Sequence, residues 1–101
     1  MLYNAQLTKF FVSVVKDGRI TSEHITIYMA LFQLWNLNKF INPISVTRKE
    51  VTELVKITQP SIYNRCMKEL AAFGYIEYVQ SFHPVLGSLV HLKGEPVNVE
   101  Q

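Results

Sequence analysis

The sequence contains little cysteine, glycine or proline. It has one cysteine, Cys66, together with 4 glycines and 4 prolines in 101 residues. A single cysteine excludes an internal disulfide framework and suits a reducing compartment. So few glycines and prolines exclude collagen-like and low-complexity scaffolds, and a hydrophobic fraction of 49% excludes a disordered chain. A chain of this length and composition is expected to form one domain with a hydrophobic core.

Long hydrophobic runs and the marks of a targeting segment are also missing. No stretch approaches the ~20 consecutive apolar residues that a membrane-spanning helix requires. The N-terminus lacks the basic and then apolar layout of a signal peptide. We therefore expect a small soluble protein of the cytoplasm that has no membrane partner.

Residue patterns typical of metal centres and enzyme active sites are absent from the sequence. His24, His83 and His91 are scattered along the chain, and Cys66 has no C-x-x-C partner. Cys66 lies on an apolar stripe of helical spacing, which predicts a buried side chain rather than an activated nucleophile. The four glycines form no phosphate-binding motif. We therefore expect no enzyme: no catalytic residue, no metal and no cofactor.

The charged residues, 18% of the chain, are unevenly distributed. Ten Lys and Arg against eight Asp and Glu give a formal net charge of +2. From Lys39 to Lys68, however, six basic residues stand against two acidic ones, whereas the rest of the chain has four basic and six acidic residues. A basic middle third predicts a surface for a polyanion, although an ordinary solvated face gives the same counts.

Hydrophobic periodicity and stop signals predict four helices, a short strand and a hairpin. Asp17-Gly18 ends the first helix, with the glycine in the left-handed conformation, and the second helix begins at Thr21 or Ser22. The third begins with a capping box from Thr47 to Glu50, and a glycine ends the fourth. The expected helices cover residues 4–16, 21–36, 47–55 and 59–73, and the expected strands cover residues 44–46, 75–80 and 89–92.

Apolar residues at helical spacing predict which sides of the helices face the core. The second helix is apolar on two sides and the first is apolar as well, which is more than one small core needs. We therefore expect a homodimer. The aromatic run Tyr28, Phe32 and Trp35 could line a ligand pocket, but core packing is its expected role, so no small-molecule effector is expected. The other residues expected to face the core are Val51, Leu54 and Val55 in the third helix and Ile62, Cys66, Leu70 and Phe73 in the fourth. The apolar stripe of the first helix consists of Leu7, Phe10, Phe11, Val14 and Val15.

Two helices joined by a tight turn and followed by a hairpin have the element order of a winged helix. The run from Ile57 to Ile76, ITQPSIYNRCMKELAAFGYI, resembles the recognition helix and first wing strand of winged helix-turn-helix DNA-binding proteins. The shared features are the Ile-Thr turn, the late Lys-Glu-Leu and the Gly-Tyr-Ile that opens the wing. The chain is also similar to small stand-alone bacterial, Bacteroidetes-type members. The resemblance implies a mainly α fold with a small β-hairpin wing in a single domain, residues 1–101. Its parts are an N-terminal helix over 1–20, which could form the dimer contact, a winged-helix core of three helices over 21–93 and a tail over 94–101.

The side of the fourth helix opposite its core stripe carries groups that bind DNA. Amide, hydroxyl and guanidinium groups can reach base edges, and Lys and Arg also neutralise phosphates. The positive N-terminal end of the third helix suits a backbone phosphate. We expect sequence-specific binding to double-stranded DNA by a transcriptional regulator or a mobile-element accessory protein, with helix 59–73 in the major groove. The expected DNA-contacting residues are Arg48, Lys49, Gln59, Ser61, Tyr63, Asn64, Arg65 and Lys68.

The predicted hairpin loop departs from the pattern of a DNA-reading wing. Its tip offers Phe82, His83, Pro84, Val85 and Leu86, where such wings carry Arg or Lys. Phe82 and Leu86 either fold back onto the core or form a patch for a protein partner. The alternative function is therefore a winged helix that serves as a protein-interaction module and has no specific DNA target.

Overall fold

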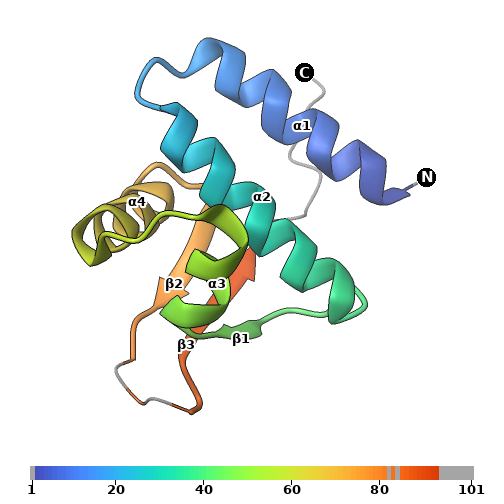
Figure 1. Ribbon diagram of the computed structural model, residues 1–101. Coiled ribbons are helices and arrows are strands. Elements are labelled where there is room, and N and C mark those ends of the chain that lie inside the picture. Colours follow the sequence, from blue (N-terminus) through green and yellow to red (C-terminus); the bar gives the residue numbers. More distant parts are fainter. Residues whose placement is uncertain (1, 82, 84, 94–101) are drawn as a thin grey trace.

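Four helices and three short strands make up the described part of the chain, residues 2–81, 83 and 85–93 of the computed structural model (Figure 1). The prediction of a mainly helical chain with a small β component is confirmed. The tail expected over residues 94–101 lies outside the described residues. No helix in this described part is long and apolar enough to cross a membrane. The elements are α1 (Leu2–Lys16), α2 (Ser22–Leu37), β1 (Ile44–Val46), α3 (Arg48–Val55), α4 (Pro60–Ala72), β2 (Ile76–Val79) and β3 (Ser88–Leu92).

The three strands form one antiparallel sheet in the order β1-β3-β2. β2 and β3 are the predicted hairpin, with Tyr78 opposite Val90. β1 pairs with the other edge of β3, where Ser45 lies opposite Leu89, and the sequence does not predict this pairing. β1 ends at Val46, two residues before α3 begins. The sheet therefore places the start of α3 beside the hairpin.

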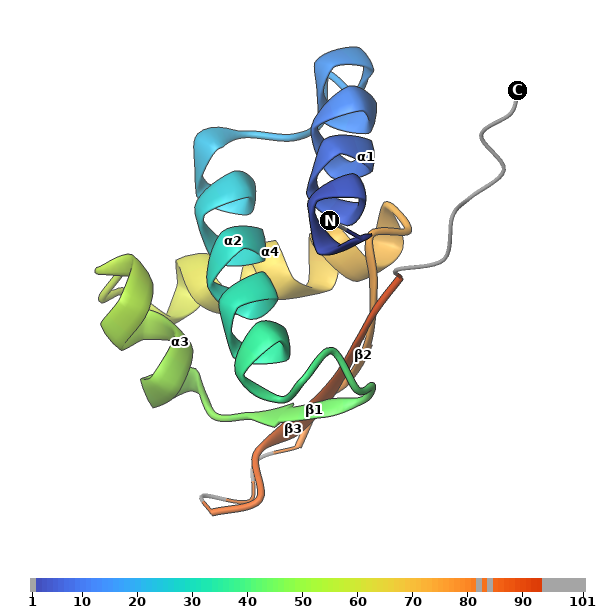
Figure 2. The ribbon, with the colours of Figure 1, turned by 90° about the vertical axis from the view of Figure 1, so that its right-hand side faces the viewer.

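The helices lie on one face of the sheet, and α2 packs against α3, α4 and β3 (Figure 2). The core forms where these elements meet. Cys66 is buried in it, as predicted, and burial raises the pKa of its thiol. The side chains with no exposed surface are Ile27, Leu31, Val51, Cys66, Met67, Leu70, Val90 and Leu92.

Hydrogen bonds from neighbouring residues to free backbone groups define the start of α3 and the end of α4. Thr47 Oγ1 accepts the N–H of Glu50 at 3.2 Å, and Glu50 Oε1 accepts the N–H of Thr47 at 2.8 Å. This confirms the predicted capping box. Gly74, with φ of 92°, ends α4, and the N–H of Tyr75 then reaches back to the carbonyl of Leu70 at 2.9 Å.

Three side chains of the apolar stripes are exposed, and the prediction that Leu54 points inward is wrong. Phe11 and Val15 of α1 are 41% and 84% exposed, and Leu54 of α3 also faces solvent. α1 docks through Phe10, which is 3% exposed and stacks on Tyr28 of α2 with ring centroids 3.8 Å apart. α1 therefore contacts the core along a narrower stripe than its apolar content predicts.

The turn between α1 and α2 is organised by Asp17. α1 ends at Lys16, as predicted, but Gly18 does not adopt the left-handed conformation. The Asp17 carboxylate accepts two hydrogen bonds of 2.8 Å from the guanidinium of Arg19 and one of 2.8 Å from the hydroxyl of Tyr75. The Asp17 carboxylate therefore organises this turn in place of the expected left-handed glycine. Its hydrogen bond from Tyr75 also connects the turn to the end of α4.

The same carboxylate makes part of the stability depend on pH. Hydrogen bonds from Arg19, and then from Tyr75, hold the pKa of Asp17 well below its ordinary value. The unfolded chain, with a carboxyl pKa of about 3.9, binds this proton first, so the stabilisation is present at neutral pH and is lost as the pH falls below about 5. We expect the stability advantage of the wild type over Asp17→Asn, measured by urea unfolding, to shrink on acidification. Tyr75→Phe should lie between them, and a constant advantage at every pH would contradict the prediction.

Candidate functional site

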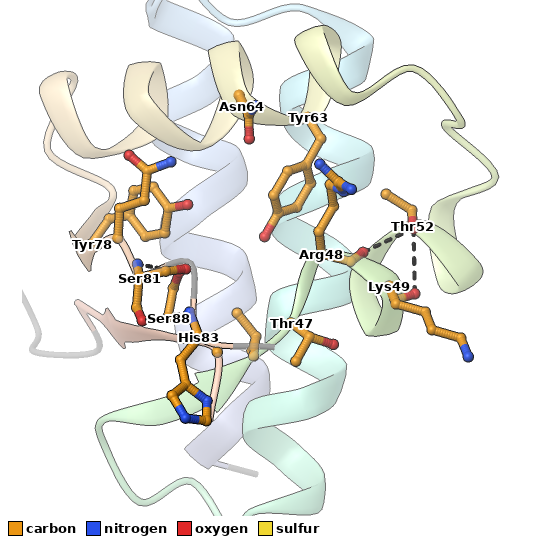
Figure 3. Close-up of a pocket in the computed structure, with 13 residues that line it drawn as sticks. Thr47, Arg48, Lys49, Thr52, Tyr63, Asn64, Tyr78, Ser81, His83 and Ser88 are labelled. Atoms are coloured by element: carbon orange, nitrogen blue, oxygen red, sulfur yellow. Dashed lines mark hydrogen bonds between the residues drawn. The ribbon is translucent and has the colours of Figure 1, made fainter. Parts of the chain in front are cut away.

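An open groove of about 500 Å³ lies where α3, α4 and the β2–β3 hairpin meet (Figure 3). Its walls come from the start of α3, the first two turns of α4, the end of β2 and the loop that leads to β3. Among the described residues, no Asp or Glu lines it, whereas cationic, amide, hydroxyl and phenol groups do. The lining residues are Val46, Thr47, Arg48, Lys49, Thr52, Tyr63, Asn64, Tyr78, Gln80, Ser81, His83, Gly87 and Ser88.

The capping box places Arg48 and Lys49 at the N-terminal end of α3, where they line the groove (Figure 3). Both residues are exposed, and neither forms an ion pair with an acidic residue in the described ranges. The Glu50 carboxylate beside them is bonded to Thr47 and does not line the groove. The partial positive charge of the helix terminus adds to the two cations. This end of the groove therefore favours an anion.

The prediction that Tyr63 lies on the exposed side of α4 is wrong. Its side chain is 3% exposed, and burial, followed by the nearby Tyr78, raises the pKa of its phenol. The buried stripe of α4 is displaced from the predicted one, which runs through Ile62 and Phe73, and both of these are only partly buried. The residues of the buried stripe are Tyr63, Cys66, Met67 and Leu70.

Asn64 and two further polar residues of α4 are accessible, as is Gln59 at its N-cap, as the sequence predicts. Asn64 lines the groove (Figure 3), and its amide has no hydrogen-bond partner among the residues that the structure describes. Gln59, Ser61 and Lys68 are exposed. Amide, hydroxyl and ammonium groups all donate hydrogen bonds, and the first two also accept them. Together these residues give α4 a polar surface that can bind a polar ligand.

Arg65 reaches α2 instead of the groove. Its Nη2 donates to Glu23 Oε1 at 2.7 Å, and its Nε lies 3.5 Å from Glu69 Oε1. Hydrogen bonds to the Cys66 sulfur and to Glu23 raise the pKa of the guanidinium. Glu69 Oε1 also lies 2.8 Å from Nε2 of the buried His24. The structure therefore separates Arg65 from Arg48 and Lys49.

Sequence reasoning misses this ion-pair network, although two of its contacts carry a signal. The first is the spacing of four residues between Arg65 and Glu69 on one helix. The second is His24, three residues after Thr21, where a side chain can accept the N–H of the capping residue, as Nδ1 of His24 does at 2.9 Å. Glu23 carries no signal, because its partner is 42 residues away along the chain.

The tip of the hairpin loop is apolar and exposed. Val85 is 78% and Leu86 is 64% exposed, so the option that Leu86 folds back onto the core is wrong. Phe82 and Pro84 lie outside the described residues. Nδ1 of His83 accepts the N–H groups of Val85 and Leu86 at 3.2 and 3.1 Å. His83 thus shapes the loop through its ring, and the described part of the tip offers no Lys or Arg.

The apolar surplus of α1 and α2 is partly absorbed by the core. Tyr28 and Trp35 are buried, and Phe32 packs against Trp35 with ring centroids 5.8 Å apart, so the aromatic run belongs to the core as expected. A shallow groove of about 390 Å³ remains between α2 and α3. The homodimer stays a prediction, and the exposed apolar residues of α1 available to it are Phe11, Val12 and Val15.

The described ranges contain no group of three or more His, Cys, Asp or Glu placed to hold a metal ion. Comparisons of the chain with protein-family models, with curated proteins and with solved structures find no match. We therefore infer a function from the groove and from α4.

Proposed function

We propose that this chain is a winged helix-turn-helix protein that binds double-stranded DNA, as a transcriptional regulator or a mobile-element accessory protein. α3, a short turn and α4 are followed directly by the β2–β3 hairpin, which is the element order of that fold. α4 is then the recognition helix and the hairpin is the wing. The observation that carries the proposal is the groove between these elements, which no acidic residue of the described ranges lines or neutralises and which has the cations Arg48 and Lys49 at one end.

Two sets of side chains have separate roles in this proposal. Arg48 and Lys49 bind backbone phosphates, because their charges and the end of α3 both favour an anion. The accessible polar residues of α4 meet base edges in the major groove, where amides pair with adenine and cations with guanine. Tyr63 is buried and has no part in base reading. The proposed base-reading residues are Gln59, Ser61, Asn64 and Lys68.

Replacing the two groove cations is expected to weaken DNA binding and to flatten its salt dependence. Each lost phosphate contact reduces the slope of log affinity against log salt by about 0.9. Arg48→Gln/Lys49→Gln should therefore reduce the slope by up to about 1.8, and the affinity at low salt should fall roughly tenfold or more. The measurement is a fluorescence-anisotropy titration of a labelled mixed-sequence duplex at several salt concentrations.

A matched variant separates the groove from net charge. Lys16→Gln/Lys39→Gln removes the same charge from two exposed positions that do not line the groove, and it should keep the wild-type slope. If both double variants lost the same amount of affinity and of salt slope, binding would depend on overall charge, and the groove would have no special role.

Specificity is tested by capture of fragmented genomic DNA from the source organism, sequenced beside Asn64→Ala/Lys68→Ala. We expect enrichment of a few sites that the variant loses, because base contacts specify where phosphate contacts only position. Two-fold symmetric sites would fit the proposed homodimer. Uniform weak capture by both proteins would contradict sequence-specific binding.

A winged helix that serves as a protein-interaction module is the second candidate. It is favoured by Val85 and Leu86, which the hairpin tip exposes where a DNA-reading wing carries cations. An apolar protein interface loses little affinity as salt rises, whereas a phosphate-binding surface loses it steeply. Absence of DNA capture at low salt would leave this second function in place of the first.

A further inference from the structure

We propose that Arg65 does not bind DNA but positions α4 on α2, and that Glu23 and Glu69 keep its guanidinium from the DNA. The inference rests on the proposed function, because it assigns which side of α4 faces the duplex. Arg65 lies near the middle of the proposed recognition helix, where the sequence alone predicts a DNA contact.

Asn64 and Arg65 are adjacent in α4 but face different parts of the molecule. Consecutive residues of a helix point about 100° apart. Asn64 lines the groove that α4 forms with α3 and the hairpin, whereas Arg65 reaches Glu23 in the first turn of α2. Arg48 lines the same groove as Asn64 (Figure 3). A phosphate strand in the groove therefore meets α4 on the side away from Glu23.

Arg65 belongs to a series of polar contacts that joins α2 to α4. The N–H of Thr21 donates to Nδ1 of His24 at 2.9 Å, so the proton of this ring is on Nε2, which donates to Glu69 Oε1 at 2.8 Å. His24 is 2% exposed, and a buried donor therefore fixes Glu69. The forked guanidinium of Arg65 contacts Glu69 and Glu23 together, at 3.5 and 2.7 Å. A lysine ammonium is a single point charge and holds such a pair of carboxylates less well.

Glu23 competes with DNA phosphates for the same guanidinium. The side chains of Arg65 and Glu23 are 49% and 40% exposed, so this ion pair is weak, and without Glu23 only the longer ion pair with Glu69, at 3.5 Å, competes with a phosphate for the guanidinium. A helix in the major groove has a phosphate strand on each side. Once released, Arg65 can reach the strand opposite the one that Arg48 binds, and it would add about one phosphate contact.

The first test is the salt dependence of binding to a mixed-sequence duplex. Glu23→Gln should steepen the slope by about 0.9, the value of one phosphate contact, and raise the affinity at low salt roughly two- to fivefold. Glu23→Gln/Arg65→Gln should return the slope to the wild-type value. Glu53→Gln removes the same charge from an exposed position on α3 and should leave the slope unchanged. Equal slopes for Glu23→Gln and Glu53→Gln would overturn the competition between Glu23 and DNA.

The single variant Arg65→Gln tests whether Arg65 contacts DNA in the wild-type protein. If the wild-type Arg65 already contacts a phosphate, this variant loses about 0.9 of the slope, and the inference is overturned. An unchanged slope with a lower urea midpoint supports a positioning role. Arg65→Lys should recover only part of that midpoint, because it keeps the charge and loses the fork.

A second measurement needs no DNA. The urea midpoints of Glu23→Gln, Arg65→Gln and the double variant form a double-mutant cycle. We expect the double variant to unfold at the midpoint of Arg65→Gln, since the pair is already broken there. Additive losses would overturn the pairing. If the wild type shows no salt-dependent binding to DNA, the proposed function fails, and this cycle still decides whether Arg65 positions α4.

Discussion

Gly87→Ala is expected to destabilise the protein by about 2 to 5 kcal/mol, the combined cost of backbone strain and a steric clash. Gly87 has φ of 70°, and an added Cβ would lie 2.3 Å from the carbonyl oxygen of Val46 and 3.2 Å from Cγ2 of Thr47. Val46 is paired with Ser88 in the sheet, so its carbonyl cannot move without loss of the β1–β3 pairing. Because α3 follows Val46 by two residues, we also expect weaker DNA binding, as Arg48 leaves its place in the groove.

Two other glycines are controls for this substitution in thermal and urea unfolding. Gly74 has φ of 92°, but an added Cβ would meet nothing within 4 Å, so Gly74→Ala costs strain alone, about 1 kcal/mol. Gly18 has neither a positive φ nor a close neighbour, and Gly18→Ala should change the free energy of unfolding by less than about 0.5 kcal/mol. A Gly87→Ala variant as stable as Gly74→Ala would show that the hairpin loop does not lie against β1 in solution.

The helix ends and the hairpin are predictable because their signals are local. The bonds between Thr47 and Glu50 span three residues, and the bonds around Gly74 span a single turn. These signals act at the helix end whatever the helix packs against. The sequence therefore predicts the first and last residues of the elements to within about two residues.

The third strand of the sheet and the rotation of α4 depend on contacts between distant segments. Ser45 pairs with Leu89, more than forty positions further along the chain. α4 has two apolar stripes at helical spacing, one that begins at Ile62 and one that begins at Tyr63. Contact with α2 and β2 decides which stripe is buried. The stripe of Tyr63 is buried, although the Tyr63 hydroxyl is polar.

The same limit applies to the proposed site. The sequence identifies groups able to bind DNA, but whether a cation is free depends on which acid the fold brings to it. Arg48 has no acidic partner in the described part of the chain, whereas Arg65 meets Glu23 from a different helix. Of the residues expected to contact DNA, four line the groove, namely Arg48, Lys49, Asn64 and Tyr63, and the last of these is 3% exposed. Three others, Gln59, Ser61 and Lys68, are exposed to solvent, and Arg65 is paired with acidic residues.

Phe10→Ala is expected to show that α1 is part of the core. The Phe10 ring is 3% exposed, stacks on Tyr28 and meets the edge of the Tyr75 ring with centroids 5.5 Å apart. Truncation of a buried phenylalanine costs about 3 to 5 kcal/mol, which is a large part of the roughly 5 to 15 kcal/mol that stabilises a domain. We therefore expect a much lower urea midpoint, measured by circular dichroism and by fluorescence of Trp35.

Phe11→Ala is the matched control, because it removes the same ring from a side chain that is 41% exposed. Its loss should be about 1 kcal/mol, mainly the edge contact with Phe10, whose centroid is 5.2 Å away. If both variants were equally mild, α1 would be an appendage to the domain, and a partner would be needed to explain its apolar residues. A larger loss for Phe10→Ala than for Phe11→Ala would show that one side of α1 packs in the core. The side that carries Phe11, Val12 and Val15 would then be the part of α1 that can contact a second copy of the chain.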